Sequence, residues 1–397
     1  MLRIGVWIND DYTPSVGGGF SYYNKLITHI DNYTFDHNLE IVFVSTKQTE
    51  RLNKRKIVIG KIGFAANLLY KLIRRMPYSK LRYTLIDKLF QNKTRTLLKE
   101  KVDILYYPIQ AQQHIPHYPF IATNWDIAHL TTYPFPEFLK DDDFFRRDTW
   151  YRTHISQALM IFVESEAGKN EFINLMNFDE QRVKVVPLFA SNTTEIQVSD
   201  NEDLLSGWGL SKQQYFFYPA QFWAHKNHYN LISAFKNVEK KFPSLKLVLT
   251  GSDKGNLHYI KQLVNELQLS LKVLFLGFVS DRDLSILYSN ALALVMPSLL
   301  GPTNMPLLEA RELNCPVLCS KHKGHMEMLK DGALYFDPLN IDDIAYNMGI
   351  ITDPEFRTTL LEKAASNKKE SIFKISTTLE KMEEHFLELM AVRKTWE

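Results

Sequence analysis

The sequence predicts an α/β protein made of two doubly wound domains, and three observations support this prediction. Short apolar runs rich in β-branched and aromatic residues alternate with segments of helical periodicity along the chain. The chain has 397 residues, which is more than one ordinary hydrophobic core organises. A polar stretch of weak periodicity separates two series of these runs, as expected of a linker.

Twelve apolar runs are expected to form strands. The first half contains runs at residues 3–9, 40–46, 102–108, 120–126, 160–166 and 184–188. The second half contains runs at residues 215–221, 245–252, 273–279, 291–298, 315–320 and 333–338. Continuous apolar strands separated by helices indicate parallel sheets covered on both faces. We therefore expect domains at 1–190 and 213–375, a linker at 191–212, and a C-terminal helix at 376–397 that packs back toward the first domain.

The composition is that of a soluble globular protein, with 45% hydrophobic and 23% charged residues. No apolar run approaches the ~20 residues needed to span a bilayer. The first residues, MLRIGVWINDD, become acidic at once and lack the pattern of a signal peptide. Cys315 and Cys319 form no disulfide or zinc pattern, and we expect both to be buried. These features predict a cytoplasmic protein.

Positive charge is concentrated in residues 61–101. Eleven Lys and Arg against two acidic residues give this segment a charge of +9, and the total of +2 leaves −7 for the rest of the chain. The segment also carries apolar residues at helical spacing. It fits a surface that meets anionic lipid at the inner face of the cell membrane, and equally a solvated helix face packed on its own domain. Nucleic acid is not expected as a partner, because no binding module accompanies the charge.

Ligands of doubly wound sheets bind at the carboxyl ends of the strands, so two such domains are expected to share a deep cleft. Gly17, Gly18 and Gly19 follow the first strand and open a helix, where backbone can approach an anion. A flexible turn explains the same triplet. Asp126 and His129 follow another strand and could bind sugar hydroxyls or handle a proton, although an ordinary loop hydrogen bond is also consistent with them.

Two loops of the second half have features of an anion site. Lys226 lies between a strand end and a helix start, where a lysine is a natural phosphate partner or simply a solvated side chain. Residues 301–305 can present several backbone amides, and Pro302 and Pro306 stiffen this loop. Glu309 lies one turn into the following helix and can point into the cleft, or remain a plain surface acid.

Together these stretches resemble one family. PSLLGPTNMPLLEARELNCPVLCS is similar to the hallmark segment of retaining GT-B glycosyltransferases of family 4, also described as glycosyl transferases group 1. YPAQFWAHKNHYNLISAF resembles the diphosphate segment of that family, PSVGGGFSYYNKLI its N-terminal glycine loop, and NWDIAHLTTYPFPEF its acceptor-side loop. The resemblance covers roughly residues 1–365 and is most specific in the second half. It implies the GT-B fold, in which two Rossmann-like domains face a central cleft.

The sequence departs from the family pattern at three positions. The family has paired glutamates, of which Glu309 matches the second, whereas Gly301 occupies the place of the first. A subgroup carries GPTN here, and Thr303 or Asn304 could replace the missing glutamate by hydrogen bonding. The phosphate-binding arginine of the family falls on Gln221, which leaves Lys226 as the matched cation. Trp125 stands where a histidine is common.

The resemblance implies a nucleotide-diphosphate sugar donor, bound mainly by the second domain. Lys226 and the amides of residues 302–305 are expected to hold the diphosphate, except that Pro302 has no amide hydrogen. Glu309 is expected to bind the ribose, and the backbone at Phe278 and Val279 the base. The remaining donor-side positions implied by the family are Gly17, Gly18, Gly19, Gln221, Gly251, Thr303, Asn304 and Met305. The residues expected to be catalytic are Asp126, His129, Lys226 and Glu309.

The expected function is transfer of a hexosyl group to a glycan or lipid-linked acceptor in cell-surface polysaccharide synthesis, with retention, without a metal and without a cofactor. The alternative is a weakened GT-B scaffold that binds nucleotide sugars or a partner, an interpretation favoured by the missing glutamate and arginine. A phosphorylase on the same fold needs a phosphate pocket or a lysine-bound cofactor, and the sequence shows a motif for neither.

Overall fold

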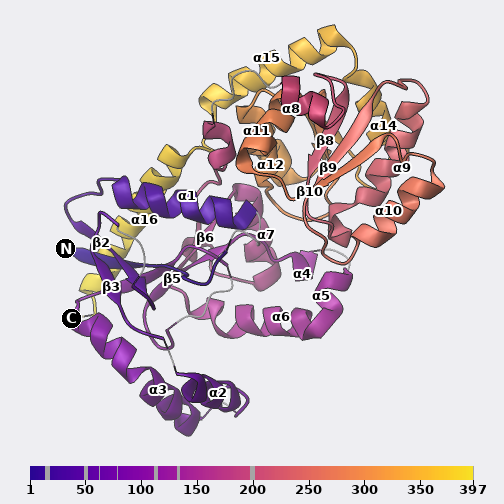
Figure 1. The fold of residues 1–397 in the computed structure, drawn as a ribbon. Helices are drawn as coiled ribbons and strands as arrows, with labels where there is room; N and C mark the ends of the chain where they lie inside the picture. Colours follow the sequence, from indigo (N-terminus) through magenta and orange to yellow (C-terminus); the bar gives the residue numbers. More distant parts are fainter. Residues whose placement is uncertain are drawn as a thin grey trace.

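The computed structural model describes residues 1–13, 18–48, 52–61, 63–77, 79–110, 115–131, 135–196 and 202–396. These residues form two α/β domains, each built on a parallel sheet, with helices packed around the sheets (Figure 1). The predicted fold class is confirmed, and all twelve predicted runs contain a strand. The stretch at 197–201, within the expected linker, lies outside the described residues.

The N-terminal sheet has seven strands in the order β3-β2-β1-β4-β5-β6-β7. They are β1 (Leu2–Trp7), β2 (Leu39–Ser45), β3 (Lys56–Val58), β4 (Ile104–Tyr107), β5 (Phe120–Asn124), β6 (Met160–Val163) and β7 (Val183–Val185). All neighbouring pairs are parallel. The edge strand β3 was not predicted, because the apolar run at 57–59 is only three residues long.

The C-terminal sheet has six parallel strands in the order β10-β9-β8-β11-β12-β13. They are β8 (Tyr215–Pro219), β9 (Lys246–Thr250), β10 (Val273–Gly277), β11 (Ala293–Met296), β12 (Val317–Ser320) and β13 (Leu334–Phe336). In both domains the chain reverses direction across the sheet beside the first strand, which is the topological switch point where ligands of such sheets bind. Four successive side chains of β8 are fully buried, since helices cover both faces of this sheet (Figure 1).

The helices follow the periodic segments between the strands. They are α1 (Gly18–Asn32), α2 (Phe64–Ile73), α3 (Lys80–Lys99), α4 (Ala128–Thr131), α5 (Pro136–Leu139), α6 (Asp143–Thr153), α7 (Glu166–Met176), α8 (Glu202–Gly207), α9 (His228–Glu239), α10 (Leu257–Glu266), α11 (Asp281–Asn290), α12 (Met305–Glu312), α13 (Lys323–Leu329), α14 (Ile341–Ile350), α15 (Pro354–Glu370) and α16 (Ile375–Lys394). Short 3₁₀ turns include η5 (Asn192–Glu195) and η6 (Ala224–Lys226). Side-chain caps fix several starts: Ser165 accepts from the Gly168 amide, and Ser280 forms a capping box with Asp283.

Helix α16 carries the chain back from the C-terminal domain to the N-terminal domain (Figure 1). It packs on β1 and α1, and Phe386 contacts the rings of Tyr106 and Phe162. Near its start the Thr378 hydroxyl donates to the Pro187 carbonyl at 2.7 Å, and near its end Arg393 pairs with Asp103 at 2.9 Å. The N-terminal domain therefore includes a helix from the far end of the chain.

The domains also meet across the cleft. Both carboxylate oxygens of Glu327, on α13, accept from the amides of Glu166 and Ala167 at 2.9 Å each. These amides belong to the first turn of α7, where a negative charge is favourable. The C-terminal domain thus caps a helix of the N-terminal domain.

The loop between β11 and α12, residues 297–304, is held against α13. The Ser320 hydroxyl donates to the Ser298 carbonyl at 2.7 Å, and the Ser298 hydroxyl donates to the Leu300 carbonyl at 2.8 Å. A Cβ added at Gly324 would lie 1.6 Å from the Pro302 carbonyl oxygen, so backbone meets backbone at this contact. Only glycine fits here, and the loop takes its position from this contact.

We predict that Gly324→Ala lowers the free energy of unfolding by about 1–3 kcal/mol, the usual cost of overpacking. The rigid Pro302 carbonyl must move to admit the new methyl group, which also displaces the loop. Urea titration of the purified variant measures the change.

Gly349→Ala is the matched control, because an added Cβ at this helical position meets nothing within 4 Å. Removing a helical glycine should leave stability unchanged or raise it by about 0.5–1 kcal/mol. Equal behaviour of the two variants would contradict the assigned role of the Gly324 contact.

Candidate functional site

A cavity of about 300 Å³ lies between the two domains, at the carboxyl ends of the strands. The N-terminal domain lines it with residues that follow β5 and β6 and with residues of α5 and α6. The C-terminal domain lines it with η6 and the β11–α12 loop. The lining residues are Trp125, Asp126, Ala128, Glu137, Phe138, Asp143, Arg147, Glu164, Trp223, His225, Lys226, Leu300, Gly301, Thr303 and Asn304.

Lys226 reaches this cavity from η6 and donates to the Asn304 side-chain oxygen at 3.1 Å. Strand β8 fixes the η6 turn, because the Tyr218 hydroxyl donates to the Lys226 carbonyl at 2.9 Å. Desolvation lowers the pKa of Lys226 to about 8, and the negative charges of Asp126 and Glu137 oppose this shift. The site therefore holds a partly desolvated cation that gains from an anionic ligand.

Asn304 is oriented by a buried histidine. The Asn304 amide nitrogen lies 2.9 Å from His325 Nε2, and His325 Nδ1 lies 2.9 Å from the Ser320 carbonyl oxygen. A carbonyl only accepts, so Nδ1 carries the hydrogen and Nε2 accepts from the amide. Burial lowers the pKa of His325 to about 3, which keeps the ring neutral. The remaining amide oxygen of Asn304 must then face Lys226.

The start of α12 lies next to the cavity, since Asn304 both precedes this helix and lines the cavity. Within the part of the chain that the structure describes, no side chain caps this helix, and Pro306 stands in its first turn. Amides of an uncapped first turn favour an anion. The glycine loop of the other domain reaches the same place, because a Cβ added at Gly18 would lie 2.8 Å from Met305 Cε. Gly19 lies against Tyr12 and Trp125, whereas Gly17 lies outside the described residues.

Asp126 lines the cavity and is held by an arginine that the sequence did not single out. Its Oδ1 pairs with Arg147 at 2.7 Å and accepts from the Ala128 amide at 3.0 Å. Gln110 fixes the same turn by accepting from the Trp125 and Asp126 amides. The carboxylate is therefore a fixed, paired charge on the N-terminal side of the cavity.

His129 lies behind the cavity wall. It is 3% exposed, stacks on Tyr151 with a centroid distance of 5.6 Å, and meets the ring of Phe144 edge-on. Neither ring nitrogen has a hydrogen-bond partner among the described residues. Burial and, to a smaller extent, the nearby Arg147 charge together lower the pKa of His129 to about 4. This arrangement does not bring the His129 ring to the cavity beside Asp126.

Glu309 is buried at the junction of the domains, outside the lining of the cavity. One carboxylate oxygen accepts from the Ser191 hydroxyl, beside η5, and the other from Tyr288 at 2.8 Å. Desolvation raises the pKa of Glu309, although both hydrogen bonds oppose the shift. The expected contact of Glu309 with the ribose stays a prediction.

The other expected donor-side residues lie along the ends of β8, β9 and β10. The Gln221 side chain accepts from the Trp223 indole at 3.0 Å. Gly251 has a φ of 134° and packs on the Ala220 carbonyl, where no side chain fits. Phe278 is 74% exposed, and Val279 is partly buried. None of these four residues lines the cavity that contains Lys226.

Several cavity residues were not identified from the sequence. Glu137 accepts from the backbone amide of His225 at 3.2 Å and from its ring Nδ1, so α5 and η6 are tied across the cleft. Glu164 accepts from the Thr303 hydroxyl, which joins β6 to the β11–α12 loop. Glu164 directly follows a strand, so the strand-end rule could have identified it. Arg147 belongs to helix α6, and nothing in the sequence around it indicates that it lines the cavity.

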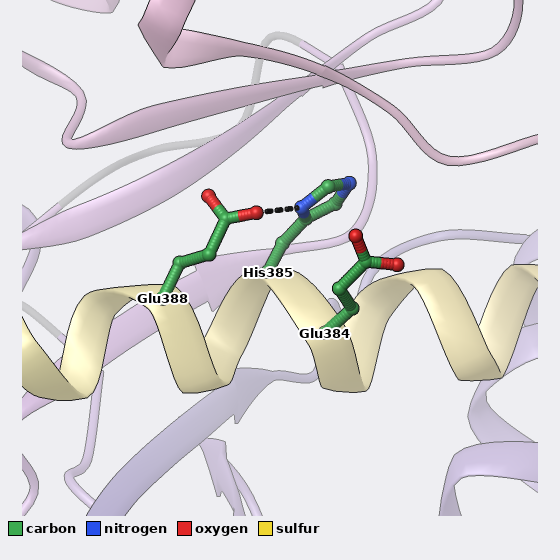
Figure 2. Close-up of side chains that lie close together, drawn as sticks. All are labelled: Glu384, His385 and Glu388. Carbon is green, nitrogen blue, oxygen red and sulfur yellow. Dashed lines mark hydrogen bonds and ion pairs between the residues drawn. The ribbon is translucent and has the colours of Figure 1, made fainter.

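One group of potential metal ligands occurs among the described residues, and it lies on α16 (Figure 2). It comprises Glu384, His385 and Glu388. Glu388 is already paired with His385 at 3.0 Å and with Lys184 at 2.6 Å. Lys184 belongs to β7, so its ion pair with Glu388 attaches α16 to the N-terminal domain. Glu388 and His385 therefore already have structural partners.

The basic segment forms α2 and α3, which project from the N-terminal domain (Figure 1). The side chains of α2 leave an apolar surface uncovered: Phe64 is 87% exposed, Leu68 53%, Leu69 47% and Leu72 54%. Exposed Lys71 and Arg75 border it. Such a patch, rimmed by positive charge, marks an interaction surface. No helix in the described ranges is long and apolar enough to cross a bilayer.

Comparison with known proteins agrees with this architecture. The model of the family Glycosyl transferases group 1 matches residues 201–374. O-antigen chain mannosyltransferase B of Escherichia coli is 26% identical over 315 residues, which cover 77% of this chain and 80% of that protein. O-antigen chain mannosyltransferase RfbU of Salmonella typhimurium is 29% identical over 46% of this chain and 48% of its own length.

Solved structures share the whole fold. Anabaena Alr3699/HepE, in complex with UDP and glucose, superposes with a TM-score of 0.69 at 17% identity and covers 98% of this chain and 100% of its own. WaaG, a glycosyltransferase involved in lipopolysaccharide biosynthesis, gives 0.67 at 14% identity, over 96% and 99%. With its two facing domains and the family match over its C-terminal domain, the chain is a glycosyltransferase of the GT-B fold.

Proposed function

We propose that this protein is a retaining, metal-independent glycosyltransferase of family 4, in the subgroup with GPTN at residues 301–304. Its donor is a nucleotide-diphosphate sugar, and its acceptor is a glycan or lipid-linked glycan in cell-surface polysaccharide synthesis. The observation that carries the proposal is the hydrogen bond from Lys226 to Asn304, beside the uncapped start of α12. The names of the O-antigen mannosyltransferase relatives support the pathway, and the complexes of HepE with UDP and UDP-glucose support the donor class.

In this mechanism the leaving diphosphate is stabilised by fixed groups. The Lys226 ammonium supplies a full positive charge, and the first-turn amides of α12 supply partial charges without reorganisation. Asn304 keeps the ammonium at the helix start. These groups stabilise charge as it develops on the diphosphate, so no metal is required of the site.

In the proposed retaining reaction, the acceptor attacks from the same face of the sugar as the one from which the diphosphate departs. The residues of the cavity agree with this course. Asp126 is paired with Arg147, which makes it a charge that orients an acceptor rather than a free nucleophile. We assign the acceptor to the N-terminal side, near Asp126. His129 takes part only as support for this wall, through its stack on Tyr151.

The departure at position 301 is compatible with activity. Gly301 has a φ of 103°, a conformation that side-chain-bearing residues rarely adopt, and an added Cβ would lie 2.9 Å from the Asn304 amide nitrogen. The loop is therefore built around glycine, and Asn304 binds the cation from inside it. An ordered polar network in place of the glutamate disfavours the alternative of a scaffold that has lost its chemistry.

We further propose that α2 and α3 dock the protein on the anionic inner face of the cell membrane. The uncovered leucines of α2 supply apolar area, and the bordering cations are attracted by anionic headgroups. A lipid-linked acceptor would then be presented to the domain that carries Asp126.

We predict that Lys226→Ala weakens donor binding by roughly tenfold or more, because a charge-assisted hydrogen bond to phosphate is worth about 1.5–3 kcal/mol. Calorimetric titration with UDP, UDP-glucose, GDP and GDP-mannose measures the loss after a thermal-shift screen identifies the preferred pair. Wild-type affinity should also fall as the pH rises through about 8, because the ammonium of Lys226 then deprotonates.

Lys254→Ala is the matched control, since Lys254 contacts Trp223 near the same turn but does not line the cavity. It should bind the donor as the wild type does. Unchanged affinity in Lys226→Ala would contradict the diphosphate assignment.

We predict that turnover persists after dialysis against EDTA, since Lys226 and the α12 amides supply the charge that a metal would otherwise provide. Product formation measured with and without added Mn²⁺ or Mg²⁺ checks this. Activity that disappears with the chelator and returns with either ion would refute metal independence.

We predict that the triple variant Lys71→Glu, Arg75→Glu and Lys80→Glu no longer sediments with vesicles of phosphatidylglycerol and phosphatidylcholine. These side chains are exposed, and each basic charge near such a surface is worth about 1 kcal/mol. The loss should be roughly a hundredfold, and wild-type binding should weaken as salt rises.

The control triple variant Lys212→Glu, Lys240→Glu and Lys241→Glu changes the charge equally on the other domain, where these lysines are exposed. It should still bind the vesicles. If both variants behave alike, or if the wild type ignores vesicles at low salt, the basic segment is an ordinary solvated surface.

A further inference from the structure

A buried glutamate that the mechanism above does not use lies in the cavity. Glu164 directly follows β6, is 8% exposed, and lines the cavity together with Lys226 and Asn304. One carboxylate oxygen accepts from the Thr303 hydroxyl of the opposite domain. Among the described residues no hydrogen bond reaches the other oxygen. The carboxyl group thus has unused hydrogen-bonding capacity inside the cleft.

The carboxyl group of Glu164 lies apart from the ion pairs of the described residues. Within the described ranges Glu164 forms no ion pair, and Arg147, the arginine of the same cavity, is paired with Asp126. Desolvation raises the pKa of Glu164 to about 8; the Thr303 hydrogen bond lowers it, and the Asp126 charge raises it. A protonated carboxyl group donates one hydrogen bond, accepts others and does not repel a diphosphate, so it suits the hydroxyl groups of a sugar.

The C-terminal domain cannot supply such a group from its own loop. Gly301 occupies the position that carries a glutamate in the resembling sequences, and its φ of 103° and its contact with Asn304 exclude a larger residue. Thr303, two residues further along this loop, instead contacts the carboxyl group of Glu164. A carboxyl group therefore meets the same loop, but it comes from the opposite domain.

We propose that Glu164 binds hydroxyl groups of the transferred sugar, and so supplies from the N-terminal domain the carboxyl group that the GPTN loop lacks. The assignment rests on the proposed function, and it goes further by naming a residue that recognises the sugar. The sugar joins the diphosphate to the acceptor, so it must lie between Lys226 and Asp126. Glu164 lines the cavity with both of them.

The test compares a sugar nucleotide with its diphosphate alone, using UDP-glucose against UDP and GDP-mannose against GDP. Glu164→Ala should weaken binding of the preferred sugar nucleotide by roughly tenfold while the diphosphate binds as before. Glu164→Gln should stay within about threefold of the wild type, because a neutral amide also donates and accepts hydrogen bonds. Melting temperatures establish that each variant is folded.

Glu166→Gln is the matched control, because Glu166 is an exposed glutamate two residues away and outside the cavity. It should leave both affinities unchanged. If Glu164→Ala alters sugar nucleotide and diphosphate equally, or neither, the assignment is overturned while the donor site stands. If the wild type binds no diphosphate at all, the proposed function fails, and the assignment fails with it.

Discussion

A lysine withdrawn from water needs a fixed hydrogen-bond acceptor, and the arrangement of the cleft depends on how this acceptor is held. Asn304 can face Lys226 with its oxygen only because its nitrogen is engaged by His325, which is itself held in one tautomer by the Ser320 carbonyl. A flipped amide would set a donor against the ammonium of Lys226 and an acceptor against the lone pair of His325 Nε2. These hydrogen bonds thus fix the orientation of Asn304 within the β11–α12 loop.

The glycines of this region serve the same arrangement. Gly301 lets the chain turn back so that Asn304 lies under its own loop, and Gly324 lets α13 approach the Pro302 carbonyl. Because α13 also carries His325, one close backbone contact sets both the height of the loop and the position of the ring that orients it. Gly301, which replaces the first glutamate of the family pattern, therefore belongs to an alternative structure of this loop. The hydrogen bonds of Asn304 with Lys226 and His325 are the other part of that structure.

The strand-end rule explains how much of the site was predictable. It identified Asp126, Lys226 and the loop at 301–304, since all follow apolar runs of parallel sheets. It could not indicate that His129 turns into the wall or that Glu309 bonds to Ser191 and Tyr288, because both outcomes depend on packing between elements distant in sequence. It did not single out Glu164, which lies within the apolar run at 160–166. The edge strand β3 was not predicted, because a strand of three residues is too short to show a hydrophobic pattern.

The return of α16 has a mechanical consequence. The chain passes between the domains twice, once beside η5 and once between α15 and α16, and the bond from Thr378 to Pro187 keeps the two passages together. Two adjacent covalent connections permit the domains to rotate about the line that joins the connections. They resist twisting or sliding of one domain against the other. Two further contacts, Glu327 with α7 and Glu137 with His225, join the domains away from these connections. The link between the two connections therefore restricts the directions in which one domain can move relative to the other, and with it the displacement of Lys226 from Asp126.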